Sequence, residues 1–265
     1  MDGFALPVKK LKGTDPIETL DLSAKSLGVA SAVVIASLIG VNGVLTECNV
    51  RGNNLDSESA KKLAMIGTKK GIMLFGIKRD QTTADFSQQS LYPSDAILLA
   101  SDLSQAVVTG SLTALDLSSN YLKDEGVSAV CEAIQSNKET KLASLNFRNN
   151  GIGPVGANAV AAMVVVTGSL TALDLWYNNL KDEGVSAVCE AIQSNKETKL
   201  SSLNFGNNYI GPVGANAVAA MVVVTGSLTE CDLSNNNMSK EGEALIRKAV
   251  EGKAGFKLHL NRDHQ

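Results

Sequence analysis

A chain of 265 residues with 44% apolar residues can bury a full core, either as one elongated domain or as two compact ones. The net charge of −3 comes without any cluster of Lys and Arg, which argues against an extended nucleic-acid interface. The start has no apolar run long enough for a secretory signal, and no run reaches the ~18 apolar residues of a membrane span. We therefore expect a cytoplasmic chain that binds neither nucleic acid nor membrane.

The pattern L-x-x-L-x-L-x-x-N-x-L recurs along the chain in units of 28 or 30 residues. In each unit the L-x-L core alternates with period 2, which predicts a short strand, and the segment after it has helical spacing. A strand and a helix this short cannot close a core alone, so the units must stack. The pattern begins at Ile17, Leu45, Leu112, Leu142, Leu170, Leu200 and Leu228, with an imperfect copy at 84–91.

The repeat is interrupted once within the chain and stops near the C-terminus. "AMIGTKKGIMLFG" resembles the final "AVEGKAGFKLHL", yet the chain continues, so we expect a turn without a helix between strands near 72–76 and 84–86. This interruption is either an old join between two arrays or an exposed loop at 78–82 that offers a second contact site. We predict a single domain, 1–265, made of N-terminal repeats 15–76, an irregular helix-less turn and repeat 77–110, regular repeats 111–250 and a cap 251–265.

Asparagine and cysteine are predicted to be structural. An Asn at the ninth position of each unit can satisfy backbone groups that stacking would leave unpaired. Cys131 and Cys189 lie two repeats apart, too far for a bridge that needs Cα atoms within roughly 7 Å, and Cys48 and Cys231 stand where other units have Leu. The asparagines are Asn53, Asn120, Asn150, Asn178, Asn208 and Asn236.

Two stretches, "SLTALDLSSNYLKDEGVSAVCEAI" and "KLASLNFRNNGIGPVGANAVAAM", resemble the ribonuclease-inhibitor-like class of leucine-rich repeats over most of 15–260. The resemblance implies an α/β leucine-rich repeat solenoid, a curved horseshoe with a parallel β-sheet on its concave face and helices on its convex face. Members of the class are mostly protein-binding scaffolds, including enzyme inhibitors, sensor domains of innate-immunity receptors and activators of the small GTPase Ran. Residues 71–103 also resemble a stretch of uncharacterised algal and protist repeat proteins.

Residues 111–168 align without gaps to 169–226, and only six of the 58 pairs differ. All six lie in predicted strands or in the loops leaving them, while the helical segments are identical. The divergence is therefore concentrated on one side of the solenoid. The pairs are Ser118/Trp176, Ser119/Tyr177, Tyr121/Asn179, Ala143/Ser201, Arg148/Gly206 and Gly151/Tyr209.

The third, fifth and seventh positions of each unit point onto the concave face. The fifth positions alternate between Asp and Asn, which either keeps the sheet soluble or forms a mildly acidic groove suited to a basic or amide-rich partner. Trp176, at a seventh position, should lie between Arg148 and Gly206. Because Trp, Tyr and Arg are enriched in binding hot spots, Trp176 is either a recognition residue or a packing residue that covers Gly206.

No nucleophile with its base, zinc spacing or phosphate loop is visible, and the two histidines, His259 and His264, fall in the predicted cap. We predict a non-enzymatic scaffold without cofactor or metal, a monomer or weak homo-oligomer, that binds a protein or peptide. The alternatives are a GTPase regulator of the Ran-activator type, with Arg148 as the partner-facing arginine, and a structural or oligomerising spacer. The predicted contact residues are Arg148, Trp176, Tyr177, Asp116, Asn146, Asp174 and Tyr209.

Overall fold

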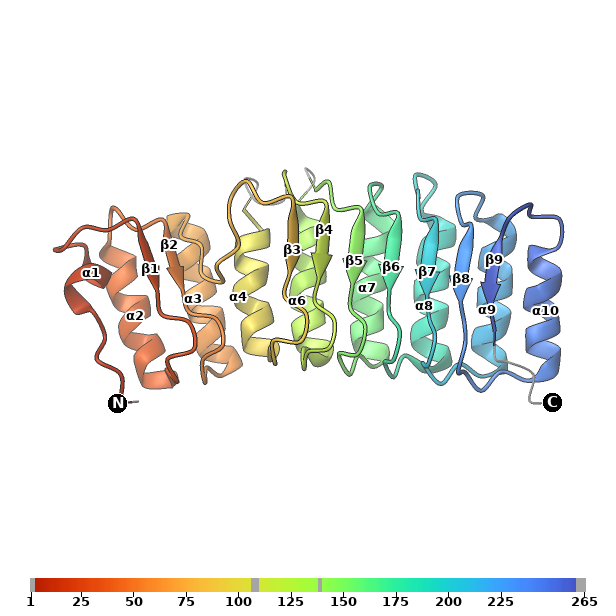
Figure 1. Ribbon diagram of the computed structural model, residues 1–265, viewed down its shortest axis with the longest axis horizontal. Coiled ribbons are helices and arrows are strands. Elements are labelled where there is room, and N and C mark those ends of the chain that lie inside the picture. The colour runs from red at the N-terminus through yellow and green to blue at the C-terminus, as the bar shows by residue number, and fades with distance from the viewer. Residues whose placement is uncertain (1–2, 106–109, 138–139, 261–265) are drawn as a thin grey trace.

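The structure is a computed structural model that describes residues 3–105, 110–137 and 140–260. Strands form one layer and helices the other, and the two termini lie at opposite ends of an elongated molecule (Figure 1). The strands are β1 (Thr19–Asp21), β2 (Glu47–Asn49), β3 (Thr83–Asp85), β4 (Ala114–Asp116), β5 (Ser144–Asn146), β6 (Ala172–Asp174), β7 (Ser202–Asn204), β8 (Glu230–Asp232) and β9 (Lys257–His259). The helices are α1 (Val8–Lys12), α2 (Val29–Val41), α3 (Ser57–Lys70), α4 (Pro93–Leu103), α6 (Lys123–Ser136), α7 (Pro154–Val166), α8 (Lys181–Ser194), α9 (Pro212–Val224) and α10 (Lys240–Val250).

Every strand pair is parallel, and neighbours in the sheet are neighbours in the chain. A two-stranded sheet joins β1 to β2, and a seven-stranded sheet runs from β3 to β9. The register brings equal positions of successive units together, for example Leu115 beside Leu145 and Asp116 beside Asn146. In most strands the central residue is buried and its two neighbours are partly exposed, as period-2 alternation requires. The predicted α/β repeat solenoid is thus confirmed.

The sheet is interrupted where the sequence departs from its repeat. Met73 pairs with Glu47 in an isolated parallel bridge, and no helix lies between that bridge and β3. On the other side of this segment the backbone N–H groups of Leu74 and Phe75 donate to the two carboxylate oxygens of Asp102, at 2.7 and 2.9 Å. A buried side chain from α4 therefore takes the place of strand pairing here. The four-part division of the domain remains a proposal.

The asparagines at the ninth position carry the hydrogen bonds that the repeat pattern predicts. Asn178, 6% exposed, donates from its amide to the carbonyls of Phe147 and Leu175, and its Oδ1 accepts from the N–H groups of Asn150 and Ile152. These contacts link one unit to the one before it. These ninth-position asparagines, called the asparagine ladder below, are therefore part of the fold, because their side chains bond to the backbone.

The four cysteines are free and buried, as predicted. Loss of hydration raises the pKa of Cys48 and of Cys231 to about 12, which keeps both thiols protonated and unreactive. At the C-terminal end α10 and β9 close the array. Residues 261–265 of the predicted cap, with His264, lie outside the described residues.

Candidate functional site

Three planar side chains form a continuous stack where β5 and β6 end. The guanidinium carbon of Arg148 lies 4.1 Å from the centroid of the Trp176 ring. The ring of Tyr177 lies on the same indole, with centroids 5.1 Å apart and planes 26° from parallel. Arg148 is exposed and makes no ion pair with any described residue. The stack thus presents an unpaired cation held in place by an aromatic ring.

Trp176 also packs on the backbone of the following strand. A Cβ added to Gly206 would lie 2.6 Å from Cδ1 and 3.0 Å from Nε1 of the indole. The ring therefore occupies the space that a side chain at position 206 would need. The equivalent position in the first block has a side chain, that of Arg148. This is the contact expected of a packing residue, and it leaves Trp176 half-buried while the Arg148 side of the stack stays open.

The Asp and Asn side chains at the fifth positions have a structural role that was not predicted from the sequence. Each of these Asp and Asn side chains accepts a hydrogen bond from the backbone N–H of the seventh residue in its own unit, at 2.8 to 3.1 Å. Such a bond ends the strand with an Asx turn. The amides of Asn146 and Asn204 then donate to the carboxylates of Asp116 and Asp174, at 3.0 and 3.4 Å.

The carboxylate of Asp174 accepts a hydrogen bond from the backbone N–H of Trp176 and is partly buried. Burial raises the pKa of Asp174, opposed by the hydrogen bond from the Trp176 N–H and by the charge of Arg148. At β3, where the seventh residue is Ser87, the hydrogen bonds from that serine lower the pKa of Asp85. The pKa values of Asp174 and Asp85 are thus shifted in opposite directions, that of Asp174 by burial and that of Asp85 by the hydrogen bonds from Ser87.

A hollow of about 350 Å³ opens beside the stack, on the edge formed by the loops that leave the strands. Exposed rings of Tyr177 and Tyr209 form part of its wall. The other lining residues are Asn149, Gly151, Asn178, Asn179 and Asn207.

Both tyrosines of the hollow hold a backbone conformation that bulky residues avoid. Tyr177 has φ 53° and Tyr209 has φ 58°, both in the left-handed region. The counterpart of Tyr209 in the first block is Gly151, for which φ 68° carries no penalty. A side chain in this region costs about 1 to 3 kcal/mol, so the tyrosines are not there to stabilise the backbone.

The structure places six of the seven predicted contact residues at the ends of β4, β5 and β6. Asp116, Asn146 and Asp174 lie side by side at the ends of β4, β5 and β6, next to the stack. Tyr209 lies apart from the concave face, across the hollow from Tyr177. Sequence reasoning missed the contribution of Asn149, Asn179 and Asn207, although Asn179 was already marked as one of the six diverged positions.

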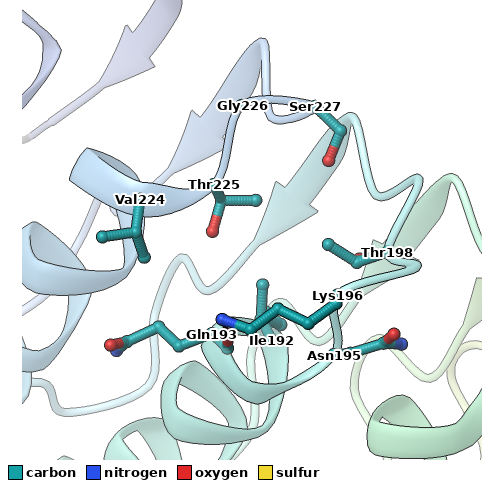
Figure 2. Close-up of a pocket in the computed structure, with 9 residues that line it drawn as sticks. All are labelled: Ile192, Gln193, Asn195, Lys196, Thr198, Val224, Thr225, Gly226 and Ser227. Atoms are coloured by element: carbon teal, nitrogen blue, oxygen red, sulfur yellow. Dashed lines mark hydrogen bonds between the residues drawn. The ribbon is translucent and has the colours of Figure 1, made fainter.

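Other hollows belong to the repeat itself. One lies between the ends of α8 and α9, at the opposite edge, where loops lead into the strands (Figure 2). The counterparts of its lining residues surround a similar hollow 58 residues earlier. Its polar groups are used internally, since Asn195 donates to Val164 and Ser227 donates to Leu200. Because both copies have this hollow, it follows from the fold and marks no specialised site.

Within the described residues, no cluster of three or more His, Cys, Asp or Glu side chains could hold a metal ion. In the same part of the chain, no helix has both the length and the apolar character needed to cross a bilayer.

The family model described as Leucine Rich repeat matches residues 111–131, 138–161 and 169–189. Mouse ribonuclease inhibitor is 33% identical over 141 residues, which cover 53% of this chain and 30% of that protein. The chain is thus built of leucine-rich repeats and is similar to ribonuclease inhibitor over about half of its length.

Other relatives of this leucine-rich repeat protein are larger. RAN GTPase-activating protein 2 of Arabidopsis thaliana is 33% identical over 134 residues, 49% of this chain and 24% of that one. Mouse NACHT, LRR and PYD domains-containing protein 12 is 32% identical over 139 residues, 52% of this chain and 13% of that one. The chain thus matches less than a third of the length of these relatives. Among solved structures, an internalin from Listeria monocytogenes has a TM-score of 0.46 at 17% identity, covering 96% of this chain and 64% of that one.

Proposed function

We propose that this leucine-rich repeat protein is a non-enzymatic scaffold that binds a protein or peptide through its concave face, centred on Arg148, Trp176 and Tyr177. One observation carries the proposal. The two 58-residue blocks have kept their helices and cores identical, and five of their six differences lie at the stack or the adjoining hollow. A surface that changes while its support stays fixed is the behaviour of a recognition surface on a rigid scaffold.

The charges of the concave face favour a basic partner. Its third, fifth and seventh positions hold seven acidic and three basic side chains, although the whole chain carries a net charge of only −3. An acidic face steers a basic partner into encounter and rejects an acidic one. The acidic residues are Asp21, Glu47, Asp85, Asp116, Asp174, Glu230 and Asp232, and the basic ones are Arg51, Arg148 and Lys257.

The composition of the surface supports protein recognition. Tyr, Asn and Gly with a central Trp and Arg are the residues that antibody binding loops use, since Tyr and Trp offer large contact areas at a small entropic cost. Arg148 is already fixed on Trp176, so less side-chain entropy is lost when a partner binds.

Affinity capture from the native cell tests the proposal. Wild type is compared with a variant in which Arg148→Ala and Trp176→Ala are combined, and with Val155→Thr as a control on α7, away from the concave face. A partner held by wild type and the control but lost by the double variant is the expected result. If every captured protein binds all three equally, the site is wrongly placed.

A second candidate is regulation of a GTPase, favoured by the similarity to RAN GTPase-activating protein 2 and by the exposed, unpaired Arg148. In this case the arginine would be supplied to a partner's nucleotide site. GTP turnover by a small GTPase, measured with wild type and with Arg148→Ala, tests it. A rate that does not change when wild type is added removes this candidate. The four free thiols support the further proposal that the protein acts in a reducing, intracellular compartment.

A further inference from the structure

The hollow lined by Tyr177 and Tyr209 contains three positions at which the second block differs from the first, Tyr177, Asn179 and Tyr209. In the first block Tyr121 stands where the second has Asn179, and its ring stacks on Tyr92 with centroids 5.5 Å apart. The change from Tyr to Asn removes this ring, and two other changes, Ser to Tyr177 and Gly to Tyr209, add rings to the wall. Three of the six differences thus create one feature.

Most polar side chains around the hollow are not used in hydrogen bonds within the described part of the protein. Within the described residues, the side-chain amides of Asn149, Asn179 and Asn207 and the hydroxyls of both tyrosines form no hydrogen bond with another protein group. Asn178 differs, because its amide belongs to the asparagine ladder. Five hydrogen-bonding groups therefore face or border a space of about 350 Å³ between two aromatic rings.

This lining sets three requirements for a ligand. It must be uncharged, since no lining residue carries a charge to balance an ion taken out of water. It must have an apolar face that can lie on a tyrosine ring. It must also carry several hydroxyl or amide groups at its rim, because a purely apolar occupant would leave the asparagine amides desolvated and unpaired.

We propose that the hollow binds a neutral saccharide ring. A pyranose meets all three requirements, with C–H groups on its faces and hydroxyls around its edge. An aromatic side chain meets the first two requirements but does not carry several hydroxyl or amide groups at its rim. A nucleotide would bring phosphate charge onto a surface whose neighbouring concave face is acidic. The saccharide is either free or attached to a partner protein. The site shares Tyr177 with the proposed protein-binding surface but does not include Arg148.

Saturation-transfer NMR with four methyl glycosides, those of glucose, galactose, mannose and N-acetylglucosamine, tests the proposal on the full chain. At least one glycoside receives saturation from wild type, and titration gives its dissociation constant. Tyr209→Gly and Asn179→Tyr each copy the first block's residue, so both variants are expected to fold. Tyr209→Gly weakens binding about tenfold, since an aromatic contact of this kind is worth roughly one power of ten in affinity. Asn179→Tyr also weakens binding, because it removes an amide from the lining and places a ring there.

Two controls separate this site from the proposed function. Tyr92→Ala removes an exposed tyrosine outside the hollow and leaves the dissociation constant unchanged. Arg148→Ala also leaves it unchanged, even though the same variant weakens the proposed protein contact. The proposal is wrong if none of the four glycosides receives saturation, or if Tyr209→Gly and Asn179→Tyr bind as tightly as wild type.

A glycoprotein whose neutral glycans end in the sugar that binds as a methyl glycoside, tested before and after enzymatic removal of the glycans, distinguishes the two sources. Binding that disappears with the glycans places the saccharide on a protein. Binding of a methyl glycoside without binding of the glycoprotein identifies a free saccharide, and both results support the proposal. If no glycoside binds and an unglycosylated peptide is held by wild type but not by Tyr209→Gly, the hollow accepts protein side chains and the proposal fails.

Discussion

The ring of Trp176 lies against the Cα of Gly206 so closely that an added Cβ would come within 2.6 Å of it. The two residues are the seventh positions of neighbouring strands, and both differ from their counterparts in the first block. Two of the diverged positions are therefore direct neighbours in space.

Replacing Gly206 by Ala therefore displaces the indole. Gly206 does not have a positive φ, so alanine is tolerated by the backbone and the strain falls on the ring, at a cost below about 1.5 kcal/mol in unfolding free energy. Trp176 is the single tryptophan, so its fluorescence emission reports the displacement directly and shifts to longer wavelength. Gly226→Ala, at a glycine whose Cβ would meet nothing within 4 Å, leaves the emission unchanged. Identical spectra for wild type and Gly206→Ala would contradict the packing.

Trp176→Ser lowers the pKa of Asp174. The serine is smaller than the indole and exposes more of the carboxylate, so the burial that raises its pKa is reduced. The carboxyl carbon resonance of Asp174, followed by NMR as pH falls, measures the change. Asp85 in the same spectra is the internal reference, and its titration remains unchanged. A titration of Asp174 that is unaffected by the substitution would show that Trp176 is not the cause of its burial.

Neighbouring asparagines at the same loop should differ in their effect on stability. Asn178→Ala leaves the buried N–H groups of Asn150 and Ile152 without an acceptor, and each unsatisfied donor costs about 1 to 3 kcal/mol, so the unfolding free energy falls by roughly 3 kcal/mol. Asn179→Ala, at an exposed side chain, changes it by less than about 0.5 kcal/mol. Urea denaturation of both variants measures the difference. Equal losses would mean that the asparagine ladder does not carry these bonds.

Asp102 makes the stability of the sheet interruption depend on pH. Burial raises the pKa of Asp102 from 3.8 to about 7 in the folded chain, and the charge of Glu47 adds to this rise. The hydrogen bonds from the N–H groups of Leu74 and Phe75, together with the charge of Arg79, oppose it. A raised folded pKa means that the folded state holds the proton more tightly, so this contribution to stability is complete below pH 4 and is lost as pH rises to about 7.

Asp102→Asn removes that pH dependence. Denaturation midpoints measured between pH 4 and pH 8 show a smaller decline with rising pH in the variant than in wild type. The variant is also less stable at neutral pH, because an amide offers one acceptor oxygen where the carboxylate offers two. Parallel pH profiles for the two proteins would contradict the assignment of the titrating group to Asp102.

Much of the fold could be predicted from the sequence because the same leucine and asparagine spacing recurs in successive units. The leucine spacing predicts the strands and their stacking, and the ninth-position asparagines identify themselves by recurring. The bonds from fifth-position side chains to seventh-position N–H groups were not predicted, since they depend on how the chain turns at the strand end. The role of Asp102 had no periodic signal, because it occurs once.

The candidate site was predicted in part, from comparison of the two blocks. That comparison located Arg148, Trp176, Tyr177 and Tyr209, and the structure brings these residues close together. The hollow itself was missed. It depends on the left-handed backbone of Tyr177 and Tyr209 and on the loss of a ring that stacks between units, neither of which residue types alone reveal.

The most direct test of the proposed binding surface replaces three residues of the second block by their counterparts from the first. The variant that combines Trp176→Ser, Tyr177→Ser and Asn179→Tyr carries the residues that Ser118, Ser119 and Tyr121 supply 58 positions earlier, so its fold and thermal midpoint are expected to remain close to those of wild type. Isothermal titration with the protein partner identified by capture gives the dissociation constant of both forms. We expect the variant to bind at least about tenfold more weakly, as loss of aromatic hot-spot residues implies. An unchanged dissociation constant in a folded variant would contradict the claim that the diverged surface is where the partner binds.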